Sequence, residues 1–264
     1  MSAYLVRRLV HLVPTFLGAT FLAFFVLQIA PGDFLTQWAL DPKIRPETIE
    51  RMRHNFGLDR PLLLQYLIWL KNLLHGDLGI SFMYQRPVLE VVWPRIENSL
   101  ILVGLSLLFL YLIGIPIGVY QALRPYTLPD YVVSFLAYFG LAIPNFFFML
   151  ILIFLLVKVK FAYGWTPFPI GGMTSQGFEQ LPPLRQWVDI LWHAILPAFV
   201  VVTADLSGLT RVMRAQVMEV LGQDYIRTAR SKGLAERVVL YKHALRNAII
   251  PILANIGGLL PGLI

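Results

Sequence analysis

Hydrophobic residues along this 264-residue chain gather in long runs that contain no Asp, Glu, Lys or Arg. Three such runs cover residues 9–32, 98–123 and 131–157, which is 24, 26 and 27 residues. A bilayer core of about 30 Å needs about 20 helical residues to cross it. Because backbone in lipid must satisfy its own hydrogen bonds, each run is predicted to be a transmembrane helix.

Two further apolar runs follow. The run 190–210 is interrupted only by Asp205, and the run 247–264 is still apolar where the sequence stops. They predict a fourth span and the beginning of a fifth. A membrane chain normally closes with a polar tail, so we expect the natural chain to continue beyond Ile264.

The first run follows Arg7 and Arg8, as the apolar segment of a signal peptide would. It is longer than the usual 7–15 apolar residues of such a peptide, so it is predicted to be an uncleaved helix. The segment 31–98 has shorter helical patterns at 46–56 and 61–75, followed by Gly57 and Gly76, with Asp59 near the start of the second. These helices are expected to pack on the outer mouth of a helix bundle or to lie flat on the membrane surface.

Composition agrees with a membrane protein, since 57% of the residues are hydrophobic and only 14% are charged, against about 25% charged residues in soluble domains. The net charge of +7 would suggest nucleic acid in a soluble protein. No surface that interleaves aromatic and basic residues supports that interpretation. Cysteine is absent, which excludes disulfides, thiolate metal sites and cysteine nucleophiles.

Basic residues set the predicted orientation. Arg7 and Arg8 precede the first run, Arg124 follows the second, and the segment 211–246 holds eight basic residues against three acidic ones. The positive-inside rule makes this side, and the N-terminus, cytoplasmic. Lys158 and Lys160 would then lie outside, against the trend.

The fold class predicted from these runs is an all-α, polytopic transmembrane helix bundle. Its segments are a first transmembrane helix at 1–30, an extracytoplasmic loop with short helices at 31–98, and a transmembrane core at 99–264 that includes a cytoplasmic loop at 211–246.

That cytoplasmic loop has the pattern of two short helices separated by Gly233. Asp224 can cap the first helix, Gly233 suits the position after its end, and Glu236 lies in the first turn of the second. A compact basic unit tethered at both ends to spans can act as a lever, because a partner that grips it tilts two membrane helices together. An ordinary solvated loop is the alternative.

The same segment resembles the coupling loop of permease subunits in binding-protein-dependent ABC importers. The resemblance rests on Gln223-Asp-Tyr-Ile-Arg-Thr-Ala-Arg-Ser-Lys-Gly-Leu234 and His243-Ala-Leu-Arg-Asn-Ala248. The general family pattern begins with Glu and ends with Pro; this chain lacks both, as in the dipeptide, oligopeptide and nickel branch. Other segments extend the resemblance from the first span to the last: Ala30-Pro-Gly-Asp33, Gly57-Leu-Asp-Arg-Pro-Leu62, Gly114-Ile-Pro-Ile-Gly118 and His193-Ala-Ile-Leu-Pro-Ala198.

The resemblance implies the type I ABC importer permease fold, with about five of six expected spans in this sequence. It implies a multi-pass protein of a bacterial or archaeal inner membrane. Its implied partners are a second homologous permease, two ATP-binding subunits and an extracytoplasmic substrate-binding protein. The solute would be a peptide, nickel or another small molecule. The implied ATPase-coupling residues are Asp224, Tyr225, Arg227, Thr228, Ala229, Arg230, Gly233, Leu234 and Glu236.

Polar groups inside the spans are candidates for the translocation path. Asp205 could contact a cationic or amino-terminal group of a substrate, because an intramembrane charge usually faces a bundle interior or a cavity. Pro144 could kink the third span and turn the amide of Asn145 toward the path. A purely structural role is the alternative for each of them. The five histidines have no metal-ligand spacing on one helix, so neither a metal nor a cofactor is predicted.

No catalytic motif points to an enzyme. The sequence has no Gly-x-x-x-x-Gly-Lys-Ser/Thr, no His-Glu-x-x-His and no Gly-x-Ser-x-Gly. ATP hydrolysis is therefore expected on partner subunits. A self-contained secondary transporter or channel is the alternative function, although such proteins often have inverted repeats and several buried ionisable groups. A scaffold subunit is a third alternative.

Overall fold

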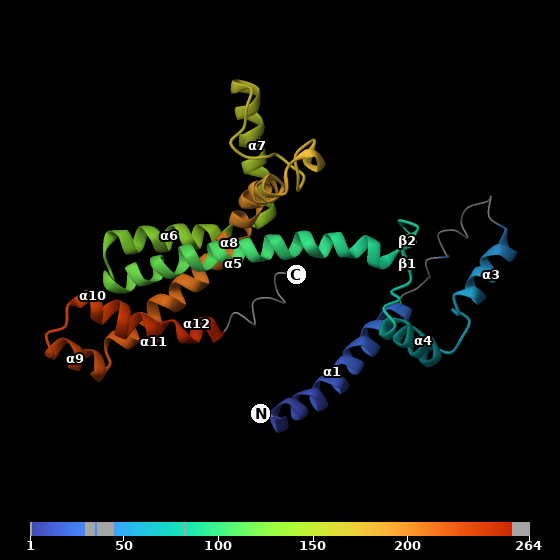
Figure 1. Ribbon diagram of the computed structural model, residues 1–264, viewed down its shortest axis with the longest axis horizontal. Coiled ribbons are helices and arrows are strands. Elements are labelled where there is room, and N and C mark those ends of the chain that lie inside the picture. Colours follow the sequence, from blue (N-terminus) through green and yellow to red (C-terminus); the bar gives the residue numbers. More distant parts are fainter. Residues whose placement is uncertain (1, 30–34, 36–44, 82, 255–264) are drawn as a thin grey trace. The chain divides into compact units, whose positions relative to one another are not determined.

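The computed structural model describes residues 2–29, 35, 45–81 and 83–254, and it divides into a first unit, 1–94, and a second unit, 95–264. Within the described residues, four helices are long and apolar enough to cross a membrane (Figure 1). They are α1 (Ser2–Ile29), α5 (Val88–Leu123), α7 (Asn145–Tyr163) and α8 (Pro183–Leu221). The predicted all-α, polytopic fold is confirmed. The fifth run begins in α12 (Ile250–Ala254), and residues 255–264 lie outside the described residues.

The third apolar run is not one continuous helix. It forms α6 (Leu128–Ala142) and α7, which change direction between them (Figure 1). Ile143 is extended, with φ −89° and ψ 123°, and Pro144 is the N-cap of α7. Proline has no backbone N–H and disfavours helical geometry in the residue before it. The predicted kink is thus a helix boundary, and the expectation of a single span at 131–157 was wrong.

The first unit holds α1, the short helices α3 (Pro46–Asn55) and α4 (Leu62–Leu74), and the paired strands β1 (Ile80–Ser81) and β2 (Arg86–Pro87). Tyr66 joins α4 to α1: its hydroxyl donates to the Leu17 carbonyl at 3.1 Å, and its ring meets Phe21 edge-on at 5.2 Å. The two short helices end as predicted, with Gly57 and Gly76 at positive φ. Asp59 does not cap α4, whose N-cap is Pro61; its carboxylate lies 2.7 Å from Nδ1 of His54.

In the second unit, glycines allow α5 and α6 to approach α8 closely. A Cβ atom placed on Gly118 would lie 2.6 Å from Cβ of Met213 and 2.8 Å from the Thr210 carbonyl oxygen. One placed on Gly114 would lie 2.7 Å from Leu209, and one on Gly140 would lie 3.0 Å from the Thr203 carbonyl oxygen. Small residues at such spacing let membrane helices pack backbone to backbone. The sequence Gly114-Ile-Pro-Ile-Gly118 is therefore a packing motif.

The segment between α7 and α8 is fastened to α8. It contains the short helix η1 (Phe178–Gln180). Ser175 donates from its backbone N–H and its hydroxyl to the Asp189 carboxylate, at 2.8 and 2.6 Å. Buried His193 lies one turn further along α8, with Nδ1 2.8 Å from the Asp189 carbonyl oxygen. These contacts give His193 a structural role.

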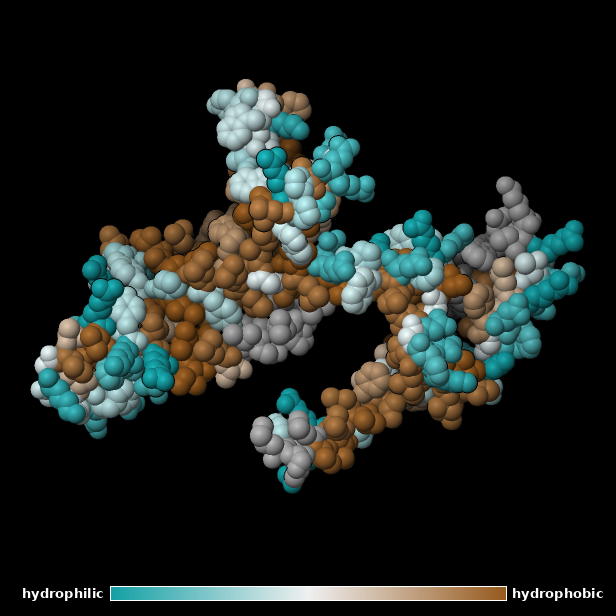
Figure 2. Space-filling model, viewed as in Figure 1, coloured by the Kyte–Doolittle hydropathy of each residue, from teal (hydrophilic) through white to brown (hydrophobic). Residues whose placement is uncertain are grey.

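Hydrophobic side chains cover much of the helical surface. Figure 2 shows them over the middle of α5, α6 and α8, and shows hydrophilic residues over the end of the second unit that holds α9 and α10. Such an apolar exterior suits lipid contact, because soluble monomers rarely expose apolar patches larger than a few hundred Å². The buried cluster beneath it is formed by Ala122, Met213, Val217, Ala248 and Ile252.

Candidate coupling site

The coupling site begins where α8 leaves the apolar part of the bundle. After Gly222 the chain forms α9 (Asp224–Ser231), whose N-cap is Gln223. Asp224 therefore occupies the first helical position and does not cap α9, so that prediction was wrong. Its carboxylate still lies in the first turn, where the positive end of the helix dipole favours it. It is 3.5 Å from the guanidinium of Arg227 on the surface.

Gly233 closes α9 as predicted. Its φ is +74°, the left-handed conformation that residues with a Cβ atom rarely adopt. The N–H of Gly233 donates to the Arg230 carbonyl at 2.9 Å, and that of Leu234 donates to the Ala229 carbonyl at 3.4 Å. This pair of hydrogen bonds is the Schellman arrangement, which reverses the chain directly after a helix.

A charged pair joins the two arms across Gly233. Arg230 donates two hydrogen bonds to the Glu236 carboxylate, from Nη2 at 2.7 Å and from Nε at 3.2 Å. The hydrogen bond from Arg230 holds the pKa of Glu236 below its ordinary value, and the same hydrogen bond raises the pKa of Arg230. Both groups are therefore charged across the physiological range, and the pair connects the two arms on the exposed side of the turn.

The second arm runs on from Glu236 without a break. It comprises α10 (Glu236–Val238), the π-helical turn η2 (Val239–Leu245) and α11 (Arg246–Ala248), which leads to α12. The two predicted helices on either side of Gly233 are present, but the second is locally widened at η2. Single π-turns often mark functional positions in helices.

The underside of this unit is apolar and holds it to α8. Ile226 and Val239 are fully buried, and Ala229 and Ala244 are nearly so. These four residues pack together against Val220 and Leu221, in the last turn of α8. Burial of these side chains stabilises the contact between the two arms and the end of α8.

The outer face presents the remaining predicted coupling residues. All of them except Ala229 are exposed: Asp224, Tyr225, Arg227, Thr228, Arg230, Gly233, Leu234 and Glu236. Two large side chains on this face, Tyr225 and Leu234, are 41% and 40% exposed. The Tyr225 hydroxyl accepts a hydrogen bond from Asn247 at 3.0 Å, which ties the first arm to α11. Exposed aromatic side chains among arginines are typical of a protein-binding surface.

A buried polar cluster that was not predicted from the sequence joins α5, α6 and α8. Asp130 at the start of α6 is 3% exposed, and it accepts a hydrogen bond from Nη2 of Arg214 on α8 at 2.9 Å. Gln121 on α5 donates to Asp130 and to Ser134 at 3.0 and 2.9 Å, and the Tyr126 N–H donates to Asp130 at 2.9 Å. The sequence held one signal for this cluster: Asp130 directly precedes one apolar run, and the polar residue Gln121 lies inside another. This cluster fastens α5, α6 and α8 together about three turns before α9.

The candidate pathway residues are not brought together. Asp205 is exposed on α8, and Asn145 begins α7 directly after Pro144. Oδ1 of Asn145 is buried and has no hydrogen-bond partner among the described residues. Across the described part of the chain, no group of three or more histidine, aspartate or glutamate side chains is arranged to hold a metal ion.

Comparison with known proteins gives the class to which this arrangement belongs. Residues 114–264 match the family model of the binding-protein-dependent transport system inner membrane component, and residues 1–103 match the model of its N-terminal part. The chain therefore belongs to this family. It is a membrane-spanning permease subunit of an ABC importer, and the secondary transporter or channel is not favoured.

Similar proteins cover almost the whole chain. The oligopeptide transport system permease protein AppB of Bacillus subtilis is 44% identical over 265 residues, which is 100% of this chain and 80% of the relative. The dipeptide transport system permease protein DppB of Escherichia coli K12 is 36% identical over 97% of this chain and 79% of its own length. The di/tripeptide transport system permease protein DppB of Pseudomonas aeruginosa is 35% identical over 97% of this chain.

Proposed function

We propose that the unit formed by α9, Gly233 and α10 is the docking site for an ATP-binding subunit and passes its motion to α8. The observation that carries this proposal is the two-sided construction of the unit. Its underside is buried against the end of α8 around Ile226, while its outer face exposes Tyr225, Leu234 and arginines. A partner that moves the outer face must therefore move α8 as well.

The proposed complete importer contains a second homologous permease, two ATP-binding subunits and an extracytoplasmic substrate-binding protein. ATP hydrolysis belongs to the ATP-binding subunits, and this chain has no catalytic role. The two states of the permease are inward-facing and outward-facing. ATP shifts the population between them only to the extent that the assembly binds it better in one state.

The proposed orientation places the N-terminus and the docking unit in the cytoplasm. Its support is the distribution of basic residues, with eight in the segment 211–246 and two before the first span. The segment 1–30 is then the first transmembrane helix, 31–98 is extracytoplasmic, and 99–264 is the core that forms the path.

The proposed solute is a peptide, because the similar proteins are named as permeases for oligopeptides, dipeptides and tripeptides. Asp205 is the proposed contact for its ammonium group, since an intramembrane carboxylate favours a cation or a water-filled cavity. Asn145, which follows Pro144, has a buried amide oxygen without a partner among the described residues and is the proposed contact for a peptide N–H.

Substitution of Gly233 tests the docking unit. A Cβ atom at this position meets no atom within 4 Å, so a substitution strains the backbone without a clash inside the chain. Gly233→Val should abolish ATP-driven uptake while membrane insertion persists, because a β-branched residue opposes a positive φ. Gly233→Asn should retain more uptake, since asparagine tolerates this conformation. Normal uptake by Gly233→Val would refute the lever.

Substitution of Asp205 tests the substrate contact separately. Asp205→Asn should raise the peptide concentration needed for half-maximal uptake by about tenfold, the effect of losing about 1.4 kcal/mol. Copurification of the partner subunits should be unchanged. If uptake of a peptide and of its N-acetylated form responds equally to the substitution, Asp205 does not bind the ammonium group.

A further inference from the structure

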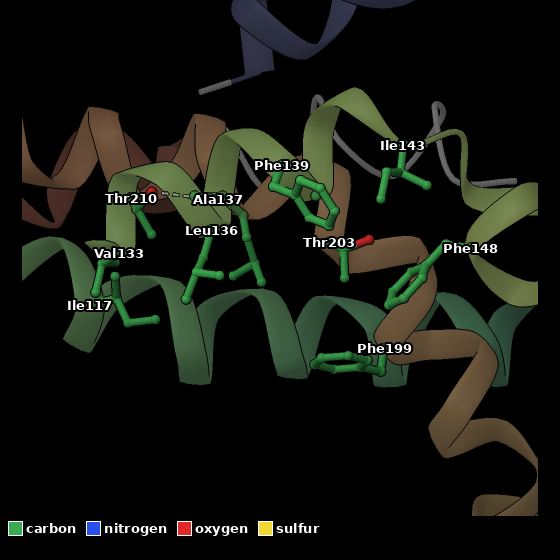
Figure 3. A pocket seen from close by; sticks show the side chains of 12 residues that line it. Ile117, Val133, Leu136, Ala137, Phe139, Ile143, Phe148, Phe199, Thr203 and Thr210 are labelled. Atoms are coloured by element: carbon green, nitrogen blue, oxygen red, sulfur yellow. Dashed lines mark hydrogen bonds between the residues drawn. The ribbon is translucent and has the colours of Figure 1, made fainter. Parts of the chain in front are cut away.

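An apolar groove runs along the second unit between α6 and α8, with Ile117 of α5 at one end and Phe148 of α7 at the other (Figure 3). Its volume is about 370 Å³, within the range of about 300–1,000 Å³ usual for small-molecule sites. Leu136 and Phe139 of α6 face Phe199 of α8 across it, and both α6 residues are more than half exposed. The groove is therefore accessible from the apolar surface of the helices.

The two hydroxyl groups in the groove are already engaged. Thr203 donates to the Val200 carbonyl at 2.7 Å, and Thr210 donates to the Leu206 carbonyl at 2.8 Å, both within α8. They leave no donor for a polar ligand. The groove thus suits a hydrocarbon chain better than a peptide backbone, which would bring unpaired N–H and C=O groups.

A polar cavity of about 60 Å³ adjoins one end of the groove, and both are lined by Ala137 and Thr210. This cavity also has Arg211 and Arg214 in its wall, together with the hydroxyl-bearing side chains of Ser134 and Tyr138. None of the residues that line it is acidic. The excess of positive charge favours an anionic group.

The two arginines differ in how far they are engaged. Nη2 of Arg214 is bound to Asp130, and its Nε is buried and has no hydrogen-bond partner among the described residues. Arg211 lies with its guanidinium 5.0 Å from the centre of the Tyr138 ring and is otherwise exposed. A planar guanidinium with free N–H groups is well suited to bind phosphate oxygens.

The dimensions match one leaflet of a bilayer. The groove-lining residues of α8 run from Phe199 to Thr210, which at 1.5 Å per residue is about 16 Å. Half of a hydrocarbon core of about 30 Å is about 15 Å. Arg211 follows directly after Thr210, where the apolar run ends, so a headgroup bound there would lie at the membrane interface. Basic pockets between membrane helices are known to bind lipid headgroups.

We propose that this groove and its basic end form a binding site for one phospholipid of the surrounding bilayer. One acyl chain lies along α6 and α8 between Leu136 and Phe199, and the phosphate binds the exposed guanidinium of Arg211 beside Arg214. The lipid fills the space between α6 and α8, and the cytoplasmic end of α8, on the proposed orientation, leads to the docking unit. This site does not depend on the identity of the transported solute.

The test uses the permease purified with its partners into nanodiscs that contain phosphatidylglycerol with a photoactivatable diazirine on its acyl chain. Wild-type protein should be labelled on α6 between Val133 and Ile143 and on α8 between Phe199 and Thr210. Arg211→Gln should lower the labelling at least about tenfold, the effect of losing a charge-assisted hydrogen bond. Arg237→Gln, an exposed arginine outside the cavity, is the matched control and should label as wild type.

Two further arms separate the contributions of the chain and the phosphate. Leu136→Asn should reduce labelling, whereas Leu108→Asn, at a similarly exposed position of α5 outside the groove, should not. Diacylglycerol with the same diazirine, which has no phosphate, should label weakly. Equal labelling by both lipids, or equal labelling of Arg211→Gln and wild type, would overturn the proposal. So would cross-linking of a Leu136→Cys variant to a protein helix that covers the groove.

Discussion

Ile226 is the residue whose removal should most cleanly disconnect the docking unit from α8. Its side chain is 0% exposed and packs in the cluster with Ala229, Val239 and Ala244. Truncating a buried isoleucine to alanine costs about 2–5 kcal/mol, and truncating it to valine costs about 0.5–1.5 kcal/mol. We expect these losses of stability to favour local opening, in which α9 detaches from the end of α8 while the spans stay folded.

The expected magnitude follows because each 1.4 kcal/mol changes the equilibrium constant for opening about tenfold. Ile226→Ala should raise the population of the detached unit at least about 30-fold, and Ile226→Val should raise it by about 2- to 13-fold. Hydrogen exchange reports this directly, since the Lys232 amide is bonded to the Thr228 carbonyl at 3.1 Å in the closed unit. ATP-driven uptake in proteoliposomes should fall in the same order.

The control is Ile250→Ala, at a position that is 58% exposed. This substitution should change the free energy of local opening by no more than about 0.5 kcal/mol, as most surface substitutions do. If Ile226→Ala leaves both the exchange of α9 and the uptake at the level of the control, the buried cluster does not transmit motion. If exchange rises but uptake is unchanged, the unit is closed as described but its rigidity has no role in transport.

Three further predictions concern packing and charge. Asp130→Ala should destabilise the purified permease by about 3 kcal/mol in thermal unfolding, because it leaves a partly buried guanidinium unpaired; adding Arg214→Met should recover part of the loss. Gly118→Ala should cost about 1–3 kcal/mol because its methyl would meet the α8 backbone, whereas Gly104→Ala, which meets nothing within 4 Å, should be neutral or stabilising. The pair that Glu236 forms with Arg230 should be intact above the ordinary carboxyl pKa of 4.5 and be lost as the pH falls through the lowered pKa. The protection of the α9 amides against hydrogen exchange, corrected for the pH dependence of the intrinsic exchange rate, should then be constant from about pH 5 to 8. Glu236→Gln should reproduce the acid state at neutral pH.

Each of these predictions has a contradicting result. If the double variant of the Asp130 pair is no more stable than Asp130→Ala, the loss does not come from an unpaired charge. Equal melting temperatures for the two glycine variants would show that α5 and α8 do not meet at Gly118. A steady change in the corrected protection of the α9 amides between pH 6 and 8 would mean that another group controls the opening of α9.

Most of the spans could be predicted from the sequence because a lipid environment excludes charge, so that a long charge-free run indicates helical backbone. The two arms around Gly233 could be predicted for a similar reason, since a left-handed position after a helix strongly favours glycine. Both inferences depend on neighbouring residues only. The family resemblance added the docking role, which no residue pattern alone required.

Other features depend on contacts between distant residues or on competing local rules. Asp130 and Arg214 are separated by 84 positions, and neither residue signals its partner in the sequence. A proline inside an apolar run can either kink a helix or end it, and the sequence around Pro144 does not distinguish the two. The packing of the surrounding helices decides between them. Asp224 favours an N-cap by its chemistry, but the helix begins one residue earlier, with Gln223 as the cap. The groove between α6 and α8 arises from the arrangement of four helices, α5 to α8, and has no sequence signature.

Photo-cross-linking from the outer face of the docking unit tests the central claim most directly. A benzophenone amino acid replaces Tyr225, which is exposed on α9, and in a control it replaces Phe161, which is 88% exposed on α7. The account predicts that the probe at position 225 attaches to an ATP-binding subunit, with a yield that changes when ATP is bound, and that the probe at position 161 does not. Absence of any ATP-binding subunit among the products at position 225, in a complex that still transports, would contradict it.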